Sequence, residues 1–203
     1  MAVSSYSHHS LEERLYLLRH GHSEANEAGL IVSDPNNGVA GYGLTQKGRD
    51  QVAVSIEGFA RRPSGSTTGV IYSSPFLRAV ETAEIAAIKL GWPVRVTDNL
   101  RERGFGEFEL TGDTHYQQVW DQDEIDPSHT QWGVESVIEV WQRLEDFLEE
   151  VSISHSAQTV LMVTHGDPAS ILMRKLRGID FPSHHRTCAP ETGQLISVPF
   201  RQI

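Results

Sequence analysis

Three short apolar runs, each followed by a segment of helical periodicity, most constrain the fold of this 203-residue chain. The runs at 15–18, 70–72 and 160–163 are unbroken, which is typical of strands buried on both faces of a parallel sheet. Residues 94–96 form a candidate fourth strand and 194–198 a candidate fifth. Strands that alternate with helices predict an α/β fold, with a single doubly wound, mostly parallel sheet and helices on both faces.

The helical segments carry recognisable start and stop signals. Thr45 is placed to cap a first helix, and Ser74-Pro75 has the pattern of an N-cap followed by a first-turn proline. Gly91 is expected to end that second helix. The segments 30–43 and 58–69 are rich in glycine, proline or polar residues and are expected to be loops. We therefore expect four helices, over about 45–60, 74–90, 135–152 and 166–176.

Composition limits the classes of protein that this chain can belong to. The net charge is −10 and the isoelectric point is near 5.4, whereas a diffuse nucleic-acid binder needs the opposite sign. No apolar run approaches the roughly 20 residues of a membrane-spanning helix. The single cysteine, Cys188, excludes an internal disulfide and a cysteine-built metal site. We expect a cytoplasmic protein without nucleic-acid or membrane partners, with a flexible segment over 1–13 and one domain over 14–203.

Charged and polar residues gather where three of the predicted strands end. Arg19 and His20 follow the first strand, Arg78 follows the second, and His165-Gly166 follows the strand at 160–163. The carboxyl ends of parallel strands meet at one crevice, where ligands of such folds bind. Arginine side chains pair bidentately with phosphate oxygens, and helix N-termini add backbone donors. The sequence therefore predicts a focused positive pocket for a phosphoryl group in an otherwise acidic protein.

The same residues suggest a reaction. A neutral imidazole at the base of a phosphate pocket can act as a nucleophile, and a carbonyl near Gly21 would hold Nδ1–H of His20 so that Nε2 attacks. His165 can donate to a phosphoryl oxygen in the transition state. The leaving oxygen then needs a proton, for which Glu102 is the candidate donor, with Glu107 and Glu109 as nearby alternatives.

At this point the chain resembles the histidine phosphatase superfamily, which includes the cofactor-dependent phosphoglycerate mutases. The opening RHGHSEAN at 19–26 is similar to the family's RHGxSxxN motif, and a second His-Gly follows at 165–166. Four further matches lie between these two in the expected order. They are the Leu-Thr turn at 44–45, the arginine motif SSPFLRAVETA at 73–83, the acid motif at 100–106 and the helix start at 135–136.

The resemblance implies a role for each site residue. His20 would accept the phosphoryl group, with Glu102 and His165 as the other catalytic residues. Glu102 would be the proton donor and then the base for water. His22 stands where many members carry glutamate, and Asp167 follows the second His-Gly where members vary, which makes it a candidate substrate contact. The implied substrate-binding residues are Arg19, Arg78, Ser23, Asn26, Thr45 and Gly166.

These observations favour a metal-independent phosphatase that hydrolyses a small phosphomonoester and needs no cofactor. A metal site is the less favoured alternative, because His20-x-His22 lacks a carboxylate at ligand spacing and stands beside an arginine. A phosphoglycerate mutase and a catalytically silent binding module stay open as alternatives.

The segment 111–134 bears on the choice between phosphatase and mutase. A mutase must hold a second phosphoryl group, yet this segment contains no lysine or arginine. We expect its five carboxylates to repel a second phosphate near the pocket mouth. Two basic residues, Arg101 and Arg103, flank Glu102. They could bind a second phosphate or a carboxylate of the substrate, which keeps the mutase alternative open. The carboxylates are Asp113, Asp121, Asp123, Glu124 and Asp126.

Overall fold

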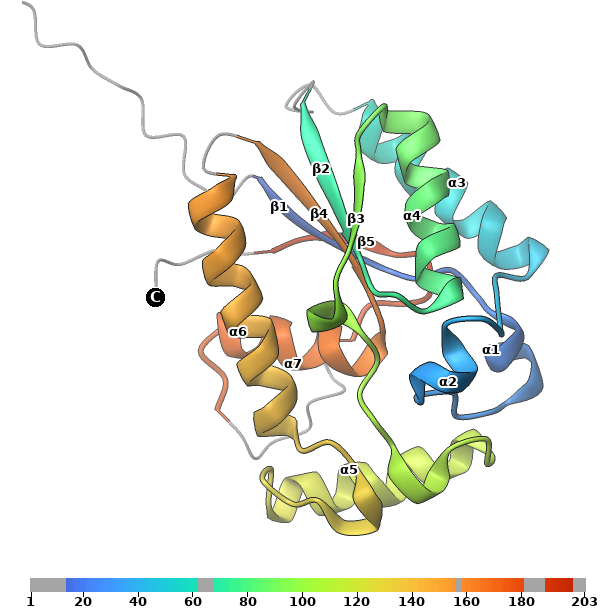
Figure 1. Cartoon of the computed structure of the whole chain (residues 1–203), viewed down its shortest axis with the longest axis vertical. Coiled ribbons are helices and arrows are strands. Elements are labelled where there is room, and N and C mark those ends of the chain that lie inside the picture. Colours follow the sequence, from blue (N-terminus) through green and yellow to red (C-terminus); the bar gives the residue numbers. More distant parts are fainter. Residues whose placement is uncertain (1–13, 62–67, 156–157, 181–188, 199–203) are drawn as a thin grey trace, which may run out of the picture.

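A computed structural model describes residues 14–61, 68–155, 158–180 and 189–198, and five strands in this part of the chain form one sheet (Figure 1). Their spatial order is β3-β2-β4-β1-β5. The first four strands are parallel, whereas β5 runs antiparallel to β1. The expected mostly parallel α/β sheet is confirmed. The strands are β1 (Leu15–Arg19), β2 (Gly69–Ser73), β3 (Val94–Val96), β4 (Thr159–Thr164) and β5 (Leu195–Ser197).

The strand register brings three chain segments to one edge of the sheet. Arg19, the last residue of β1, pairs with Thr164, the last residue of β4. Ser73, at the end of β2, pairs with Val163. The residues that follow these strands therefore start from neighbouring positions, as the predicted crevice requires.

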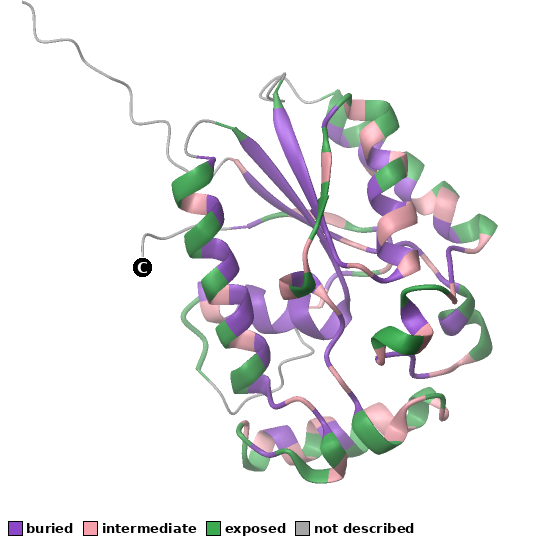
Figure 2. Ribbon diagram, in the orientation of Figure 1, coloured by how far each residue is buried: buried purple, intermediate pink, exposed green. Residues whose placement is uncertain are grey.

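Helices cover both faces of the sheet (Figure 1). One face is covered by α3 (Gln46–Ala60) and α4 (Leu77–Leu90), which pack on a core that includes Leu18. The other face is covered by α6 (Val137–Ser154) and α7 (Gly166–Leu176), which pack on a core that includes Leu17. Successive residues of β1 alternate between the two cores, and β2 and β4 are buried throughout (Figure 2). No helix in the described ranges has the length and apolar character needed to cross a bilayer.

The start of α4 differs from the prediction. The helix begins at Leu77 with extended Phe76 as its N-cap, and that cap makes no side-chain hydrogen bond, so the predicted cap at Ser74 is wrong. The Ser74 hydroxyl instead contacts the backbone N–H of Phe76 and the ring of His165. Gly91, with φ of +70°, ends the helix as expected, because this left-handed conformation favours glycine.

Other short elements lie between the strands. Within the predicted loop 30–43 the chain forms the single-turn helix α2 (Pro35–Gly38), capped by Asp34, and α1 (Glu24–Ala28) precedes it. The unpredicted α5 (Tyr116–Ile125) lies beyond the carboxyl ends of the strands, at the bottom of Figure 1. Short 3-10 turns span Asp98–Leu100, Gly106–Phe108, Asp113–His115 and Gln131–Gly133.

Candidate active site

His20 follows β1 and is held in one tautomer by its neighbours. Its Nδ1 lies 2.8 Å from the carbonyl oxygen of Gly21, and a carbonyl can only accept, so Nδ1 carries the proton. Nε2 therefore presents its lone pair, to which Nε of Arg78 donates across 3.2 Å. The turn requires glycine at position 21, because a Cβ there would lie 2.5 Å from the carbonyl oxygen of Gly48.

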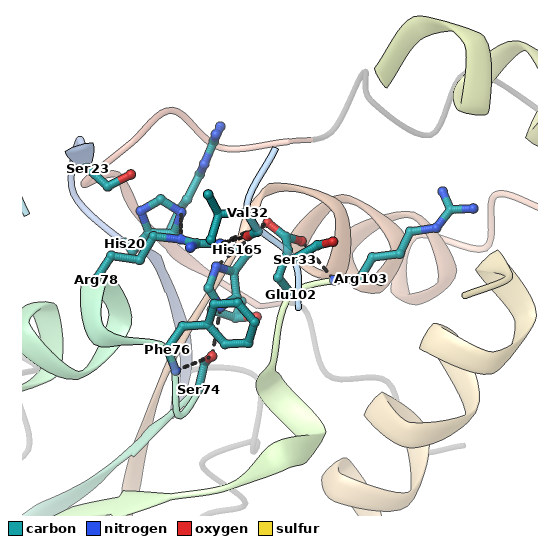
Figure 3. A network of polar contacts seen from close by, with 12 residues as sticks. His20, Ser23, Val32, Ser33, Ser74, Phe76, Arg78, Glu102, Arg103 and His165 are labelled. Atoms are coloured by element: carbon teal, nitrogen blue, oxygen red, sulfur yellow. Dashed lines mark hydrogen bonds and ion pairs between the residues drawn. The ribbon is translucent and has the colours of Figure 1, made fainter. Parts of the chain in front are cut away.

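Arg78 projects from the first turn of α4 into the space beside His20 (Figure 3). Its Nη2 donates to the carbonyl of Val32 at 2.9 Å and lies 3.8 Å from Oε2 of Glu102. Its Nη1 is buried and makes no hydrogen bond. A buried guanidinium with an unused donor is a suitable partner for an anion that enters from solvent.

His165 lies at the N-cap position of α7. The centroids of the His165 and His20 rings are 5.0 Å apart. Nε2 of His165 is 2.7 Å from the hydroxyl of Ser74. Its Nδ1 is buried and makes no hydrogen bond. This atom lies 3.7 Å from Oε2 of Glu102. When the Ser74 hydroxyl donates to Nε2, Nδ1 carries the proton and is a second unused donor.

Burial and neighbouring cations keep both imidazoles neutral. Desolvation is the largest cause that lowers the pKa of His20 well below 6.5, and the charge of Arg78 adds to it. The pKa of His165 is lowered well below 6.5 for the same two reasons. At neutral pH the site therefore holds two uncharged rings beside arginine side chains.

Glu102 is the carboxyl group of this cluster. Burial raises its pKa to about 7, the negative charge of Asp167 acts in the same direction, and Arg78 opposes them. The backbone N–H of Arg103 donates to its Oε1 at 3.0 Å. The two alternatives lie elsewhere, since Glu107 is exposed and Glu109 accepts hydrogen bonds from the segment 33–37.

Most of the predicted residues surround one small pocket of about 50 Å³. Ser23 and Asn26 form the capping box of α1 and also line the pocket. Arg19 lines it too, and its Nη1 donates to the carbonyl of Pro190 at 2.9 Å. The lining residues are Arg19, His20, Ser23, Ala25, Asn26, Leu30, Val32, Arg78, Glu102, Tyr116, Gly166 and Asp167.

A sequence model of the histidine phosphatase superfamily (branch 1) matches residues 15–201. The chain belongs to the histidine phosphatase superfamily. Phosphoserine phosphatase 1 of Hydrogenobacter thermophilus is 31% identical over 175 residues, which cover 82% of this chain and 77% of that protein. A bifunctional protein of Mycobacterium tuberculosis is 35% identical over 168 residues, 79% of this chain but only 43% of its own length.

Solved structures share the fold of this histidine phosphatase. The mycobacterial glucosyl-3-phosphoglycerate phosphatase in complex with VO3 superposes with a TM-score of 0.75, at 22% identity and with 90% of each chain covered. At that identity the likeness concerns the fold alone. With the family match, the comparisons identify the chain as an enzyme, a phosphoric monoester hydrolase of the histidine phosphatase type.

Thr45 is the one predicted site residue of this histidine phosphatase that the structure places away from the cluster. Its hydroxyl caps α3 by accepting from the N–H of Gly48, and it lies 3.0 Å from Nδ1 of His22. It does not line the pocket. Its capping role follows from the sequence pattern, whereas a pocket contact does not.

Arg103 is not available as the second anion site that the sequence left open in the mutase alternative. Its guanidinium is fully buried and donates to both oxygens of Asp123, at 2.6 and 2.7 Å, and to the carbonyl of Glu135. In Figure 3 it points away from His20. Asp123 is correspondingly buried in an ion pair and does not face the pocket mouth as a solvated charge.

Sequence reasoning missed two residues of the site, of which only Tyr116 lines the pocket. Ser74 was expected to cap a helix, and its position opposite His165 depends on the sheet register. Tyr116 lines the pocket from α5, a helix whose only buried positions are Val119 and Asp123 and which therefore lacks a readable apolar stripe.

The described residues contain no group of three or more histidine, cysteine or acidic side chains placed to hold a metal ion. The ring of His22 contacts Thr45 rather than His20. The adjacent histidines His184 and His185 and the single cysteine, Cys188, lie outside the described residues.

A larger cavity of about 860 Å³ lies along α6, but it contains neither His20 nor His165. The two arginines that line this cavity, Arg101 and Arg143, both form ion pairs with Glu135. Arg143 also reaches the backbone carbonyl of Glu102, across 3.5 Å. We therefore place the active site at the smaller pocket, which His20, Arg78 and Glu102 line and next to which the ring of His165 packs on that of His20.

Proposed function

We propose that this histidine phosphatase hydrolyses a small phosphomonoester through a phosphohistidine at His20, without a metal ion or other cofactor. One observation carries the proposal: the bond from Nδ1 of His20 to Gly21 leaves the lone pair on Nε2, in a residue that lines the pocket. A neutral ring fixed in this tautomer is ready to act as a nucleophile.

In the first step, Nε2 of His20 attacks phosphorus while the bond from phosphorus to the ester oxygen breaks. Glu102 gives its proton to the leaving oxygen, and a pKa of about 7 leaves a substantial fraction of this carboxyl protonated at neutral pH. Arg19, Arg78 and His165 stabilise the charge of the transferring phosphoryl group. Gly166 adds the N-terminus of α7.

In the second step, the roles of the carboxyl group reverse. Glu102, now ionised, takes a proton from water as the water oxygen attacks phosphorus. The phosphorus–nitrogen bond breaks, inorganic phosphate leaves, and His20 regains its lone pair. Each proton that Glu102 donates in the first step is thus recovered in the second.

The mutase alternative lacks support at the site. Retaining a second phosphoryl group requires additional cations near the pocket, but Arg103 is buried against Asp123 and Arg101 pairs with Glu135. Hydrolysis of a small ester agrees with the size of the pocket and with the name of the relative from Hydrogenobacter thermophilus.

A panel of phosphate esters assayed with and without EDTA tests this function. We expect release of inorganic phosphate from small alkyl phosphates, unchanged by the chelator. Loss of activity with EDTA and its return with zinc would revive the metal alternative. With 3-phosphoglycerate and catalytic 2,3-bisphosphoglycerate, formation of 2-phosphoglycerate faster than phosphate release would establish the mutase instead.

A further inference from the structure

The Ser74 hydroxyl is a buried polar group to which the mechanism proposed above gives no task. Ser74 directly follows β2, is 0% exposed, and its Oγ lies 2.7 Å from Nε2 of His165 (Figure 3). Its backbone N–H donates to the carbonyl of Val163 at 3.0 Å, so the pairing of β2 with β4 fixes where the hydroxyl lies. The contact is thus held by the sheet rather than by a loop.

The partners of the Ser74 hydroxyl assign the direction of its hydrogen bond to His165. The backbone N–H of Phe76 donates to Oγ at 3.3 Å, and among the described residues Nε2 of His165 is the one acceptor bonded to the hydroxyl. If Nε2 carried the ring proton, the hydroxyl proton and the lone pair of Nδ1 would both be buried without a partner. With the proton on Nδ1, only that N–H is unpaired. Because each buried unpaired polar group costs free energy, the Nδ1–H tautomer is favoured.

The carboxyl group of Glu102 favours the same tautomer. Its Oε2 lies 3.7 Å from Nδ1 of His165, where it attracts an N–H and repels a lone pair. Nη2 of Arg78 lies 3.8 Å from the same oxygen, and Arg78 is the residue that bonds Nε2 of His20. Nδ1 of His165 and the guanidinium group of Arg78 therefore converge beside the nucleophile.

Aromatic packing holds the plane of the His165 ring. The ring of Phe76 packs edge-on against it, with centroids 5.1 Å apart and planes inclined by 75°, and the ring of His20 lies 5.0 Å away at 61°. These contacts fix the plane of the ring. The hydrogen bond at Nε2 decides which of the two nitrogens carries the proton.

Resting on the proposed function, we infer that Ser74 is a positioning residue, whose hydroxyl keeps the ring proton of His165 on Nδ1 and so directs this N–H toward the phosphoryl group on His20. Ser74 acts through His165 and makes no contact with the phosphoryl group. A His165 ring protonated on Nε2 instead would present a lone pair to the phosphoryl oxygens, and would fail to stabilise their charge in either step.

The direct test is the 15N NMR spectrum of the histidine-labelled enzyme, because the chemical shifts of the two ring nitrogens show which one is protonated. The signals of His165 are assigned by their absence from His165→Gln. We expect wild type to hold the proton on Nδ1, and Ser74→Ala to carry it on Nε2 in a substantial fraction of molecules. A residue that only stabilised the fold would not change the tautomer.

The activity of Ser74→Ala is the second measurement. Its kcat/KM should fall at least about tenfold, since complete loss of a donor to the transferring group typically costs about 100- to 1,000-fold. The loss should be nearly equal for n-propyl phosphate and p-nitrophenyl phosphate, because the phosphoryl group carries its charge with either leaving group. Loss of the proton donor in Glu102→Gln, by contrast, should slow mainly the alkyl ester.

Ser73→Ala is the matched control. Ser73 precedes Ser74, is equally buried, and donates its hydroxyl to the backbone carbonyl of Ser74 at 2.9 Å rather than to a ring. This variant loses the same atom at the neighbouring position, so it should keep the proton of His165 on Nδ1 and nearly wild-type activity. Ser74→Cys keeps the size of the side chain but has a weaker donor. It should show the changes of Ser74→Ala to a smaller extent, which gives a second test if Ser74→Ala does not fold.

Protonation of His165 on Nε2 in wild type would overturn the inference, as would an unchanged tautomer or wild-type activity in folded Ser74→Ala. Equal losses of activity in Ser73→Ala and Ser74→Ala would also overturn it, and would assign both hydroxyls to the stability of the strand end. A wild-type enzyme that hydrolyses neither ester would contradict the proposed function itself, whereas the NMR spectrum would still decide the tautomer.

Discussion

Arg78 donates a hydrogen bond from Nε to Nε2 of His20, the ring atom that carries the lone pair. Both side chains are buried, each only 3% exposed. The contact explains why the pKa of His20 is lowered, since burial and the charge of Arg78 both disfavour the imidazolium. It also places a guanidinium beside Nε2, within reach of the oxygens of a phosphoryl group carried on that atom.

The first prediction concerns this guanidinium. Arg78→Ala should raise the activation free energy by about 2–4 kcal/mol, a typical loss for a preorganised charge donor. Arg78→Lys should recover little of it, because a point charge cannot replace the planar donors that reach both Val32 and His20. The measurement is kcat/KM for a small alkyl phosphate.

Arg49→Ala is the control for this series, because the Arg49 side chain is 43% exposed and pairs with Glu81 on α4. Its activity should stay within about twofold of wild type, as expected for loss of an exposed ion pair. Near wild-type rates for both Arg78 variants would show that Arg78 only stabilises its helix.

The second prediction concerns the leaving group. A proton donor matters most when the leaving oxygen is strongly basic, so Glu102→Gln should slow alkyl phosphates far more than p-nitrophenyl phosphate. The measurement is the rate of phosphoryl transfer to His20 for each ester under single-turnover conditions. Equal slowing of both esters would contradict the role of Glu102 as the proton donor.

The third prediction concerns pH. The pKa of Glu102 is raised to about 7, so the carboxyl holds its proton below this pH and loses it above. For alkyl phosphates kcat/KM should therefore fall about tenfold for each pH unit above about 7. On the acid side, the lowered pKa of His20 keeps the nucleophile neutral to below pH 6.5.

The pH profile of Glu102→Gln tests the same assignment. Glutamine does not titrate, so the decline near pH 7 should disappear from the variant's slower profile. A decline at the same pH in Glu102→Gln would assign it to another group.

The sequence predicts much of this site because its main residues follow directly from strand ends. The apolar runs locate β1, β2 and β4, and parallel pairing then brings Arg19, His20 and His165 to one edge without any knowledge of loops. Arg78 follows as well, since it lies in the first turn of the helix after β2. Local pattern and sheet topology suffice for these positions.

The remaining parts depend on long-range packing that no local pattern encodes. The segment 111–134 shows no apolar stripe, because α5 buries Asp123 in an ion pair with Arg103, which is 20 residues away. The charges of this segment were therefore expected in solvent. Ser74 has the sequence pattern of a helix cap, and only the packing of β2 against β4 makes it a partner of His165.

The fourth prediction concerns the buried ion pair. Arg103→Ala should lower the free energy of unfolding by about 3–5 kcal/mol, because the buried Asp123 carboxylate loses its guanidinium partner and keeps the contact with the ring of His129. Arg101→Ala should cost less than about 1 kcal/mol, since the Arg101 side chain is 32% exposed. Urea unfolding of both variants gives the comparison, and equal losses would contradict it.

The fifth prediction tests the central claim, that His20 carries the phosphoryl group. Rapid quench of the enzyme with a radiolabelled phosphate ester should trap an adduct that is labile in acid and stable in alkali. His20→Ala should form no adduct and lose turnover, whereas His22→Ala should still form it, because His22 contacts Thr45 outside the pocket. An adduct that persists in His20→Ala would contradict the account.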